Sequence, residues 1–419
     1  MTNNVYAASR KKPYHIKTKT VYLTVGEKYP QKLIKNNGKT IKARKIRWKS
    51  RRPSVAKITK KGIITGVKAG TAKMTAKYKG STYNFTVVVK KETPVIAAPV
   101  PDKTTIDKNL FCIPGFSYPT STDFRFYIDN PCLKTNLFSQ LESYSEDKAY
   151  ADGYSIQSPV EESRSYTLNI IDESSNKVVE SCYFNVDYRS KNIRDITALF
   201  IGDSIINSGR ITQKASDIFS SEGATLTLLG QRGTTNNKHQ GMPGWTAESC
   251  WSKASYNDCV NHFYNPAAGH FDFNYYMTTY GYSSPDFVFI QFGINDLFYV
   301  SPYNYEVGYT TYKNAMLNII NDIHAYDSNI KIVVNMITLP NESEDVFRAM
   351  YGNSISREDR RLMDIIANNK LIKDMPDYVI LNPHHLVLDS ATMIRDDVHP
   401  TQVGFDILGT LDANVMFVN

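Results

Sequence analysis

The sequence predicts a multidomain protein in which all-β segments precede an α/β domain built on a parallel sheet. Three observations lead to this prediction. The chain has 419 residues, which is more than one domain usually holds. Short β-branched strands separated by turns fill its first half, whereas apolar strands alternate with helical segments from residue 196 onward. The charge is also divided unequally between the N-terminal segment and the rest of the chain.

The overall composition excludes several classes of protein. With 42% hydrophobic and 21% charged residues, the chain is typical of globular proteins and not of disordered ones. No apolar run reaches the ~18 residues that cross a bilayer, so we expect no transmembrane segment. Five cysteines without a CxxC pair exclude a disulfide scaffold. No apolar segment precedes the small residues at 6–9, so we expect no intact signal peptide in this sequence.

The N-terminal segment is strongly basic. Residues 1–92 hold 25 of the 49 Lys and Arg but 2 of the 41 Asp and Glu, a net charge of +23, which leaves −15 on the remaining 327 residues. This asymmetry indicates two modules with different roles. A basic module attracts polyanions such as an anionic wall polymer, an acidic glycan or nucleic acid. Nucleic acid is not expected, because the lysines are scattered over strand and turn positions alike; mere solubility is the alternative explanation.

The first predicted domain, residues 13–92, is a small β-sandwich. Its expected strands are 21–25, 45–49, 55–58, 62–66, 71–76 and 83–89. The order Trp48-Lys49-Ser50, Ser54-Val55-Ala56, 61–66 and Gly70-Thr71-Ala72 resembles the bacterial immunoglobulin-like domain of group 2. The resemblance covers about one fifth of the chain and implies a spacer or adhesive role in a surface protein.

A linker and a second β-rich segment follow. Residues 91–101 contain three prolines, which favour an extended, semi-rigid spacer. Residues 103–194 predict a second β-sandwich, with strands at 124–128, 165–171 and 181–186. This segment carries no motif of chemical interest.

The third predicted domain, residues 195–419, has the alternating pattern of a doubly wound α/β fold. Near-continuous apolar strands, as in a parallel sheet covered on both faces, are expected at 197–201, 225–229, 286–292, 330–337 and 378–381. Helices are expected at 305–326 and 357–374, the first with an apolar stripe at intervals of three or four residues. Ligands of such sheets bind beyond the carboxyl ends of the strands.

The first of these strands ends in Gly202-Asp203-Ser204-Ile205. The glycine permits a sharp turn into a helix, which places Ser204 at the carboxyl edge of the sheet. There its hydroxyl can act as a nucleophile and its N–H can face an oxyanion. The alternative is that Asp203 or Ser204 is only a helix N-cap.

Two further strings fall at the same edge. After the third strand, Gly293-Ile294-Asn295-Asp296 places the Asn295 amide where it can donate to developing negative charge, although an Asx turn would explain it equally. After the second strand, residues 239–246 read as a Gly/Pro loop whose glycine N–H can approach a ligand, or as a simple turn.

The string Asp396-Asp397-Val398-His399 stands just before an expected final helix. An Asp three residues before a His can turn back and hold the imidazole Nδ1–H, which leaves Nε2 to take a serine proton. An isolated string of this type is equally compatible with a surface turn.

Taken together and in this order, the four strings resemble the SGNH hydrolases, also called the GDSL esterase superfamily, over residues 196–415. The resemblance implies a serine esterase in which Ser204 is the nucleophile, His399 the general base and Asp396 its orienting partner. It also implies an oxyanion hole formed by Ser204 N–H, Gly244 N–H and the Asn295 side chain. Neighbouring Asp203 and Trp245 are expected at the substrate.

Two features depart from the family pattern. Ile205 replaces the commoner leucine, a conservative change. The glycine of the second string must be chosen between Gly241 and Gly244, and we choose Gly244 because Gly-Trp-Thr matches the family loop better. The loop around it resembles family members that deacetylate polysaccharides.

The resulting expectation is a secreted or cell-surface bacterial esterase that removes acyl groups, O-acetyl above all, from a carbohydrate, with the basic domain attached to a wall or acidic glycan. The aromatic residues that follow Gly244 are expected to stack on sugar rings or to form core. The alternatives are a lipid or lysophospholipid esterase of the same fold and an inactive surface adhesin. We expect no cofactor and no metal, since the following histidines lack ligand spacing: His239, His262, His270, His384 and His385. Cys250 and Cys259 are candidates for a pair.

Overall fold

The structure is a computed structural model that describes residues 13–17, 19–26, 28–36, 39–90, 113–128, 137–298, 300, 304–351 and 356–419. The chain divides into two compact units, Met1–Ile96 and Ala97–Asn419. Each unit has its own hydrophobic core. In the described ranges, no helix combines the length and the apolar character needed to cross a bilayer.

The first unit consists of short strands. Its sheets have the orders β2-β9-β8-β5, β3-β7-β6 and β1-β4. The strands are β1 Tyr14–Ile16, β2 Thr20–Thr24, β3 Lys28–Pro30, β4 Leu33–Lys35, β5 Arg47–Ser50, β6 Ala56–Ile58, β7 Ile63–Gly66, β8 Gly70–Tyr78 and β9 Ser81–Lys90, with a 3-10 helix at Ala43–Lys45. Ala72, Met74 and Ala76 of β8 belong to the core, whereas Thr71, Lys73 and Lys77 are exposed and Thr75 is buried as well.

All six strand regions predicted for this unit contain a strand. The strands β1, β3 and β4, of three residues each, were not predicted. The likeness of this unit to a group 2 immunoglobulin-like domain stays a prediction.

The second unit begins with a layer of two β-sheets, ordered β10-β16-β15-β12 and β11-β14-β13. The strands are β10 Phe116–Pro119, β11 Phe124–Tyr127, β12 Leu137–Glu142, β13 Lys148–Tyr150, β14 Gly153–Ile156, β15 Glu162–Asp172 and β16 Lys177–Arg189. Between the sheets, aromatic side chains pack together, including Phe126 against Tyr154 and Phe184.

A mixed sheet forms the centre of the α/β part. Its order is β19-β20-β17-β25-β26-β27, with β18 paired to the first half of β17. All pairs are parallel except β19 with β20. The strands are β17 Ile196–Gly202, β18 Leu226–Leu229, β19 Arg232–Gly233, β20 Lys238–Gly241, β25 Phe287–Gln291, β26 Lys331–Asn335 and β27 Val379–Asn382. The carboxyl ends of β17, β20 and β25 therefore lie side by side.

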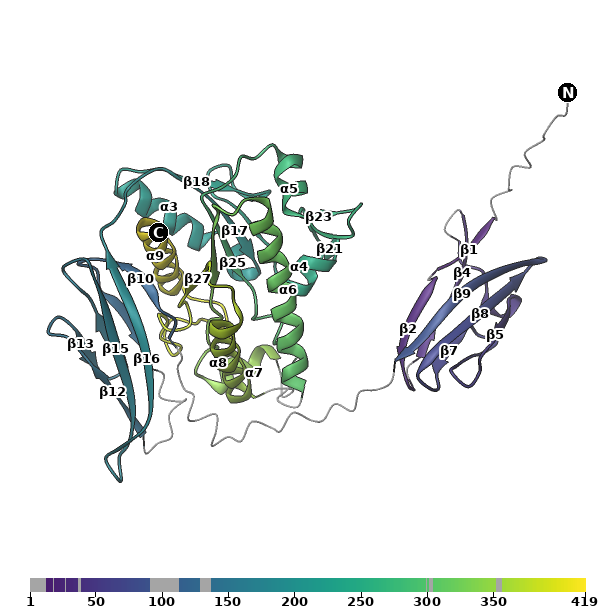
Figure 1. Ribbon diagram of the computed structural model, residues 1–419, viewed down its shortest axis with the longest axis horizontal. Helices are drawn as coiled ribbons and strands as arrows, with labels where there is room; N and C mark the ends of the chain where they lie inside the picture. Colours follow the sequence, from purple (N-terminus) through teal and green to yellow (C-terminus); the bar gives the residue numbers. More distant parts are fainter. Residues whose placement is uncertain are drawn as a thin grey trace. The chain divides into compact units, whose positions relative to one another are not determined.

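Helices cover both faces of this sheet (Figure 1). Helices α3 and α9 pack together on one face, and α5, α6 and α8 on the other. The helices are α2 Ser204–Asn207, α3 Arg210–Ser221, α4 Ala247–Ser252, α5 Phe273–Tyr280, α6 Tyr305–Tyr326, α7 Glu344–Tyr351, α8 Arg357–Asp374 and α9 Gln402–Val418, and two small hairpins lie between α4 and α5: β21 Ser255–Tyr256, β22 Cys259–Val260, β23 Tyr264–Asn265 and β24 His270–Phe271. The predicted helices 305–326 and 357–374 are confirmed.

The β layer packs on α9, so this helix is covered by the central sheet on one side and by β10 on the other. The Asn414 amide of α9 donates to the Tyr118 hydroxyl of β10 at 3.1 Å. Tyr127 N–H donates to Leu386 O at 2.8 Å, and Asn192 N–H donates to Phe417 O at 2.8 Å. The predicted segments 103–194 and 195–419 thus share one hydrophobic core.

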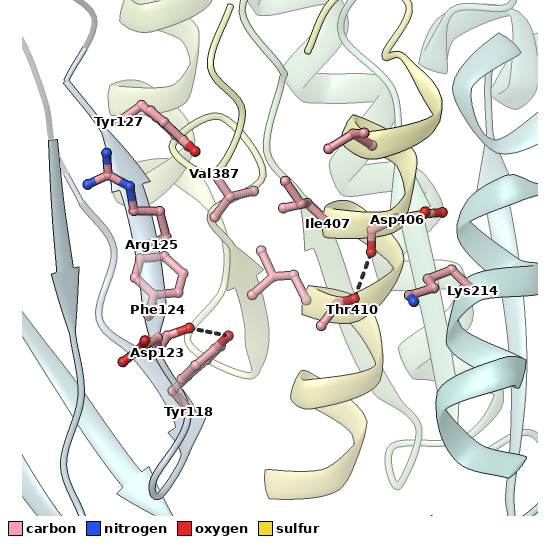
Figure 2. Close-up of a pocket in the computed structure, with 12 residues that line it drawn as sticks. Tyr118, Asp123, Phe124, Arg125, Tyr127, Lys214, Val387, Asp406, Ile407 and Thr410 are labelled. Carbon is pink, nitrogen blue, oxygen red and sulfur yellow. Dashed lines mark hydrogen bonds between the residues drawn. The ribbon is translucent and has the colours of Figure 1, made fainter. Parts of the chain in front are cut away.

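A cavity of about 320 Å³ lies in the seam between β11 and α9. Figure 2 shows Phe124 of β11 and Ile407 of α9 on opposite walls, with Lys214 of α3 at one side. None of the predicted site residues lines this cavity.

Candidate active site

Ser204 is placed by a tight turn at the end of β17. A Cβ on Gly202 would lie 2.6 Å from Gln291 O, so only glycine lets β17 and β25 approach this closely. Asp203 then caps α2, because its Oδ1 accepts from Ile205 N–H at 2.9 Å. The N-cap interpretation is therefore correct for Asp203, and Ser204 is the first residue of the helix.

The structure brings Ser204, His399 and Asp396 together, although 195 residues separate the serine from the histidine. Ser204 Oγ lies 2.8 Å from His399 Nε2. His399 Nδ1 lies 3.0 Å from Asp396 Oδ1 and 3.2 Å from Oδ2. With the Nδ1 proton donated to this carboxylate, Nε2 is the acceptor for the serine hydroxyl. All three side chains are partly exposed and so can be reached by a substrate.

The Asp396 carboxylate is held in its charged form. Partial burial acts to raise its pKa, but a hydrogen bond with Asp397, N–H groups of the following backbone and the nearby imidazole hold the pKa well below its usual range. Asp396 Oδ1 accepts from two backbone N–H groups, that of His399 at 2.9 Å and that of Val398 at 3.2 Å. A charged Asp396 accepts from His399 Nδ1–H and so fixes the orientation of the imidazole ring.

Asp397 is a further carboxylate at this site that sequence reasoning did not single out. It is fully buried, and its Oδ1 lies 3.8 Å from His399 Nδ1. Within the described residues, Asp396, Asp397 and His399 form the one group of potential metal ligands whose atoms converge. His399 of this group also contacts Ser204 Oγ through its other ring nitrogen, at 2.8 Å.

The predicted oxyanion donors lie on neighbouring loops. Ser204 is the first residue of α2, so its N–H points out of the helix end. Within the described ranges, neither Ser204 N–H nor Gly244 N–H donates to a backbone oxygen. Gly244 has φ +71°, a conformation that favours glycine. The Asn295 amide donates to Trp245 O at 3.0 Å and lies 3.5 Å from Asp203 Oδ2, which places it between the Gly244 loop and α2.

Asp296 joins the two loops that carry Gly244 and Asn295. One of its carboxylate oxygens accepts from Ala247 N–H at 2.9 Å and the other from Gly293 N–H at 3.0 Å. Burial raises the pKa of Asp296 to about 7, although these two hydrogen bonds oppose the shift. The sequence analysis assigned no role to Asp296, and the one sign of such a role in the sequence was its position next to Asn295.

Three expectations need correction. Asp203 and Trp245 are fully buried, so neither offers a surface to a substrate: Asp203 caps α2, and the Trp245 indole donates to Tyr256 O at 2.9 Å. Residues 239–241 belong to β20 instead of a loop, because Gln240 and Gly241 pair with the end of β17 and His239 pairs with β19. Cys250 and Cys259 carry free thiols, so they do not pair.

Most aromatic residues after Gly244 are core residues. The buried ones are Trp245, Phe263, Phe271, Phe273 and Tyr276. Tyr256 remains 36% exposed, and its ring packs edge-on against the ring of Trp245. Trp251, Tyr264 and Tyr275 are partly exposed as well, so four of these aromatic side chains reach the surface.

Comparisons with known proteins add the following findings. No family model and no curated protein matches the sequence. Among solved structures, a carbohydrate esterase family 3 protein from Talaromyces cellulolyticus is 15% identical, with a TM-score of 0.32, over 52% of this chain and 94% of that one. The carbohydrate acetylesterase Est24 from Sinorhizobium meliloti is 17% identical, with a TM-score of 0.34, over 52% and 96%. A lipase from a goat rumen metagenome is 11% identical, with a TM-score of 0.34, over 54% and 99%. Similarity of this extent identifies no activity for the chain.

Proposed function

We propose that the chain is a serine esterase that hydrolyses O-acyl groups, O-acetyl above all, on a carbohydrate. The observation that carries the proposal is the relay from Ser204 Oγ through His399 to Asp396, with contacts of 2.8 Å and 3.0 Å at the carboxyl edge of the sheet. The four strings that form this edge are those in which the sequence resembles the SGNH hydrolases. The loop around Gly244 supports a carbohydrate substrate through the same resemblance.

The reaction follows from the proton positions. His399 Nε2 takes the proton as Ser204 Oγ adds to the ester carbonyl, and the resulting oxyanion accepts from Ser204 N–H, Gly244 N–H and the Asn295 amide. Collapse of this intermediate breaks the bond to the sugar oxygen, which leaves with the proton from His399. A water molecule, deprotonated by His399, then attacks the acyl-serine and releases the carboxylic acid and free Ser204.

The test is hydrolysis of aryl esters of increasing acyl length. Ser204→Ala is expected to lower kcat on the acetyl ester by at least about 10⁴-fold, because it removes the nucleophile. Ser208→Ala is the matched control: its hydroxyl is in the same segment but donates to Ile205 O, so its activity should match the parent. Equal rates for Ser204→Ala and the parent would refute the esterase, and a preference for long acyl chains would replace the carbohydrate substrate with a lipid.

We also propose that the first unit binds an anionic wall polymer or acidic glycan. Arg47 of β5 stands directly opposite Lys77 of β8, and both are exposed. Like charges directly opposite each other destabilise a sheet. Acidic side chains of the same unit can do little to offset this repulsion, because Glu27 is the one acidic residue between positions 13 and 90. A polyanion would relieve this repulsion.

Retention on columns tests this attachment. The full chain is expected to bind immobilised polygalacturonate or teichoic acid at 50 mM NaCl and to elute by about 500 mM, as counterions screen the contacts. Lys77→Glu should elute earlier than the control Glu222→Gln, which changes the charge of the other unit. Retention by DNA alone would contradict the proposal.

A further inference from the structure

The outer face of the β layer in the second unit carries polar side chains around the exposed ring of Tyr183. Along β15 and β16 the side chains alternate between the core and the opposite side of the sheet, and Tyr183 of β16 is on that opposite side. Tyr183 is 74% exposed, whereas its neighbour Phe184 is buried. An aromatic side chain this exposed buries little area on folding, so it contributes little to the hydrophobic stabilisation of the layer.

The strand register places polar side chains in rows around Tyr183. Thr167 of β15 is its direct partner, and Glu142 of β12 is the partner of Thr167 on the far side. The next row holds Asn169 opposite Ser181. Rows two residues apart are separated by about 7 Å and strands by about 4.8 Å, so the side chains of this face are regularly spaced. Figure 1 shows β12, β15 and β16 side by side in this layer.

Hydrogen bonds hold these side chains in place. The Asn169 amide donates to Glu142 Oε1 at 3.1 Å, and its oxygen accepts from the Ser181 hydroxyl at 2.6 Å. On the other side of Tyr183, the Ser165 hydroxyl donates to Asn185 Oδ1 at 2.8 Å. An amide that accepts through its oxygen keeps its NH₂ group for a ligand, so Asn185 can donate outward. Side chains ordered beforehand lose less entropy on binding.

We propose that this face binds a neutral polysaccharide, with a sugar ring stacked on Tyr183 and its hydroxyls bonded to the amide and carboxylate groups of Asn185, Asn169 and Glu142. The aromatic face covers the C–H side of a sugar ring, while its hydroxyls need donors and acceptors of the kind in these rows. The rows contain no Lys or Arg, so the face does not suit a polyanion. The inference takes its ligand class from the proposed function, but it concerns a second site that requires no catalysis.

The experiment measures binding by the full chain carrying Ser204→Ala, so that the polymer is not altered. Isothermal titration uses deacetylated xylan, glucomannan and mixed-linkage β-glucan at 500 mM NaCl, which screens the basic unit. In this background Tyr183→Ala should weaken binding about tenfold or more, whereas Tyr183→Phe, which keeps the ring, should bind within about twofold of the parent. Tyr150→Ala is the matched control, because Tyr150 is 50% exposed on β13 of the other sheet.

The outcomes separate this site from the active site. Unchanged affinity of Tyr183→Ala, equal loss in Tyr150→Ala, or no binding of any of these polymers by the parent would overturn the inference. Polygalacturonate bound through Tyr183 at the same salt concentration would overturn the assignment to neutral glycans. With Ser204 intact, Tyr183→Ala should hydrolyse p-nitrophenyl acetate at the parent rate and unfold at the parent temperature, so failure of the esterase proposal would appear in a different assay.

Discussion

Asp203 shows how one residue can serve the local fold and the electrostatics of the site. Its Oδ1 accepts from Ile205 N–H, and its side chain is fully buried beside the nucleophile. Burial raises the pKa of Asp203 to about 6, although the Ile205 N–H and the charges of His399 and Arg360 oppose the shift. The folded state therefore holds a proton on Asp203 at pH values where the unfolded chain has lost it.

This shift predicts a pH-dependent loss of stability. Between about pH 4 and pH 6 the folded protein binds more protons than the unfolded chain, so the free energy of unfolding falls as pH rises, by about 3 kcal/mol for this group. Asp203→Asn keeps an N-cap oxygen but cannot titrate. Urea unfolding measured from pH 4 to pH 8 should therefore show the variant gaining stability relative to the parent between about pH 4 and pH 6, with little further change above that. A constant difference at every pH would contradict the assignment.

Two glycines of one segment serve different elements. A Cβ on Gly241 would lie 2.2 Å from Asn207 N, so Gly241 lets β20 pack against α2. Gly244 instead adopts φ +71°, and a Cβ there would meet only the end of the Asn257 side chain at 2.5 Å.

Helix α8 supports the loop that carries Asn295. Its buried residue Arg360 donates to Ile294 O at 2.6 Å and pairs with Asp364 at 2.8 Å.

Alanine at these glycines should separate packing from catalysis. Gly241→Ala forces two backbones apart and should lower the free energy of unfolding by several kcal/mol. Gly244→Ala strains one loop residue, at a cost of about 1–3 kcal/mol, and should reduce kcat on p-nitrophenyl acetate more than it reduces stability. Thermal unfolding and kinetics of both variants provide the measurement. Full activity of Gly244→Ala would remove Gly244 from the oxyanion hole.

At the scale of the whole molecule, the described residues form two separate cores. One is confined to the first unit, and the other runs from the β layer through the central sheet to α9. Helix α9 is buried on most of its surface in its second half, as a helix between two layers must be. The β layer is thus part of the fold that supports His399, which lies three residues before α9.

Truncations should reveal this division. The fragment Ala97–Asn419 is expected to hydrolyse p-nitrophenyl acetate within about twofold of the full chain, because it retains a complete core. A fragment of residues 191–419 would expose the face of α9 that β10 covers, and it should aggregate or lose cooperative unfolding. Cooperative unfolding of 191–419 with full activity would show that the β layer is a separate domain.

The sequence by itself predicted the alternation of strands and helices from residue 196, both long helices and the six strand regions of the first unit. These depend on periodicity and apolar runs, which are local properties. The same locality led to the misplacement of Asp203 and Trp245 at the substrate, because the side to which a residue points at the end of a strand depends on what packs there.

Only the tertiary structure decided the rest. The 2.8 Å contact between Ser204 and His399 requires the parallel pairing of β17 with β25 and the docking of the loop before α9. The role of Asp296 in joining two loops, the buried Arg360 below them and the shared core of the β layer all depend on contacts between distant segments. A local pattern reports which residues prefer burial or exposure, but the partner that each meets is set by the packing of the whole chain.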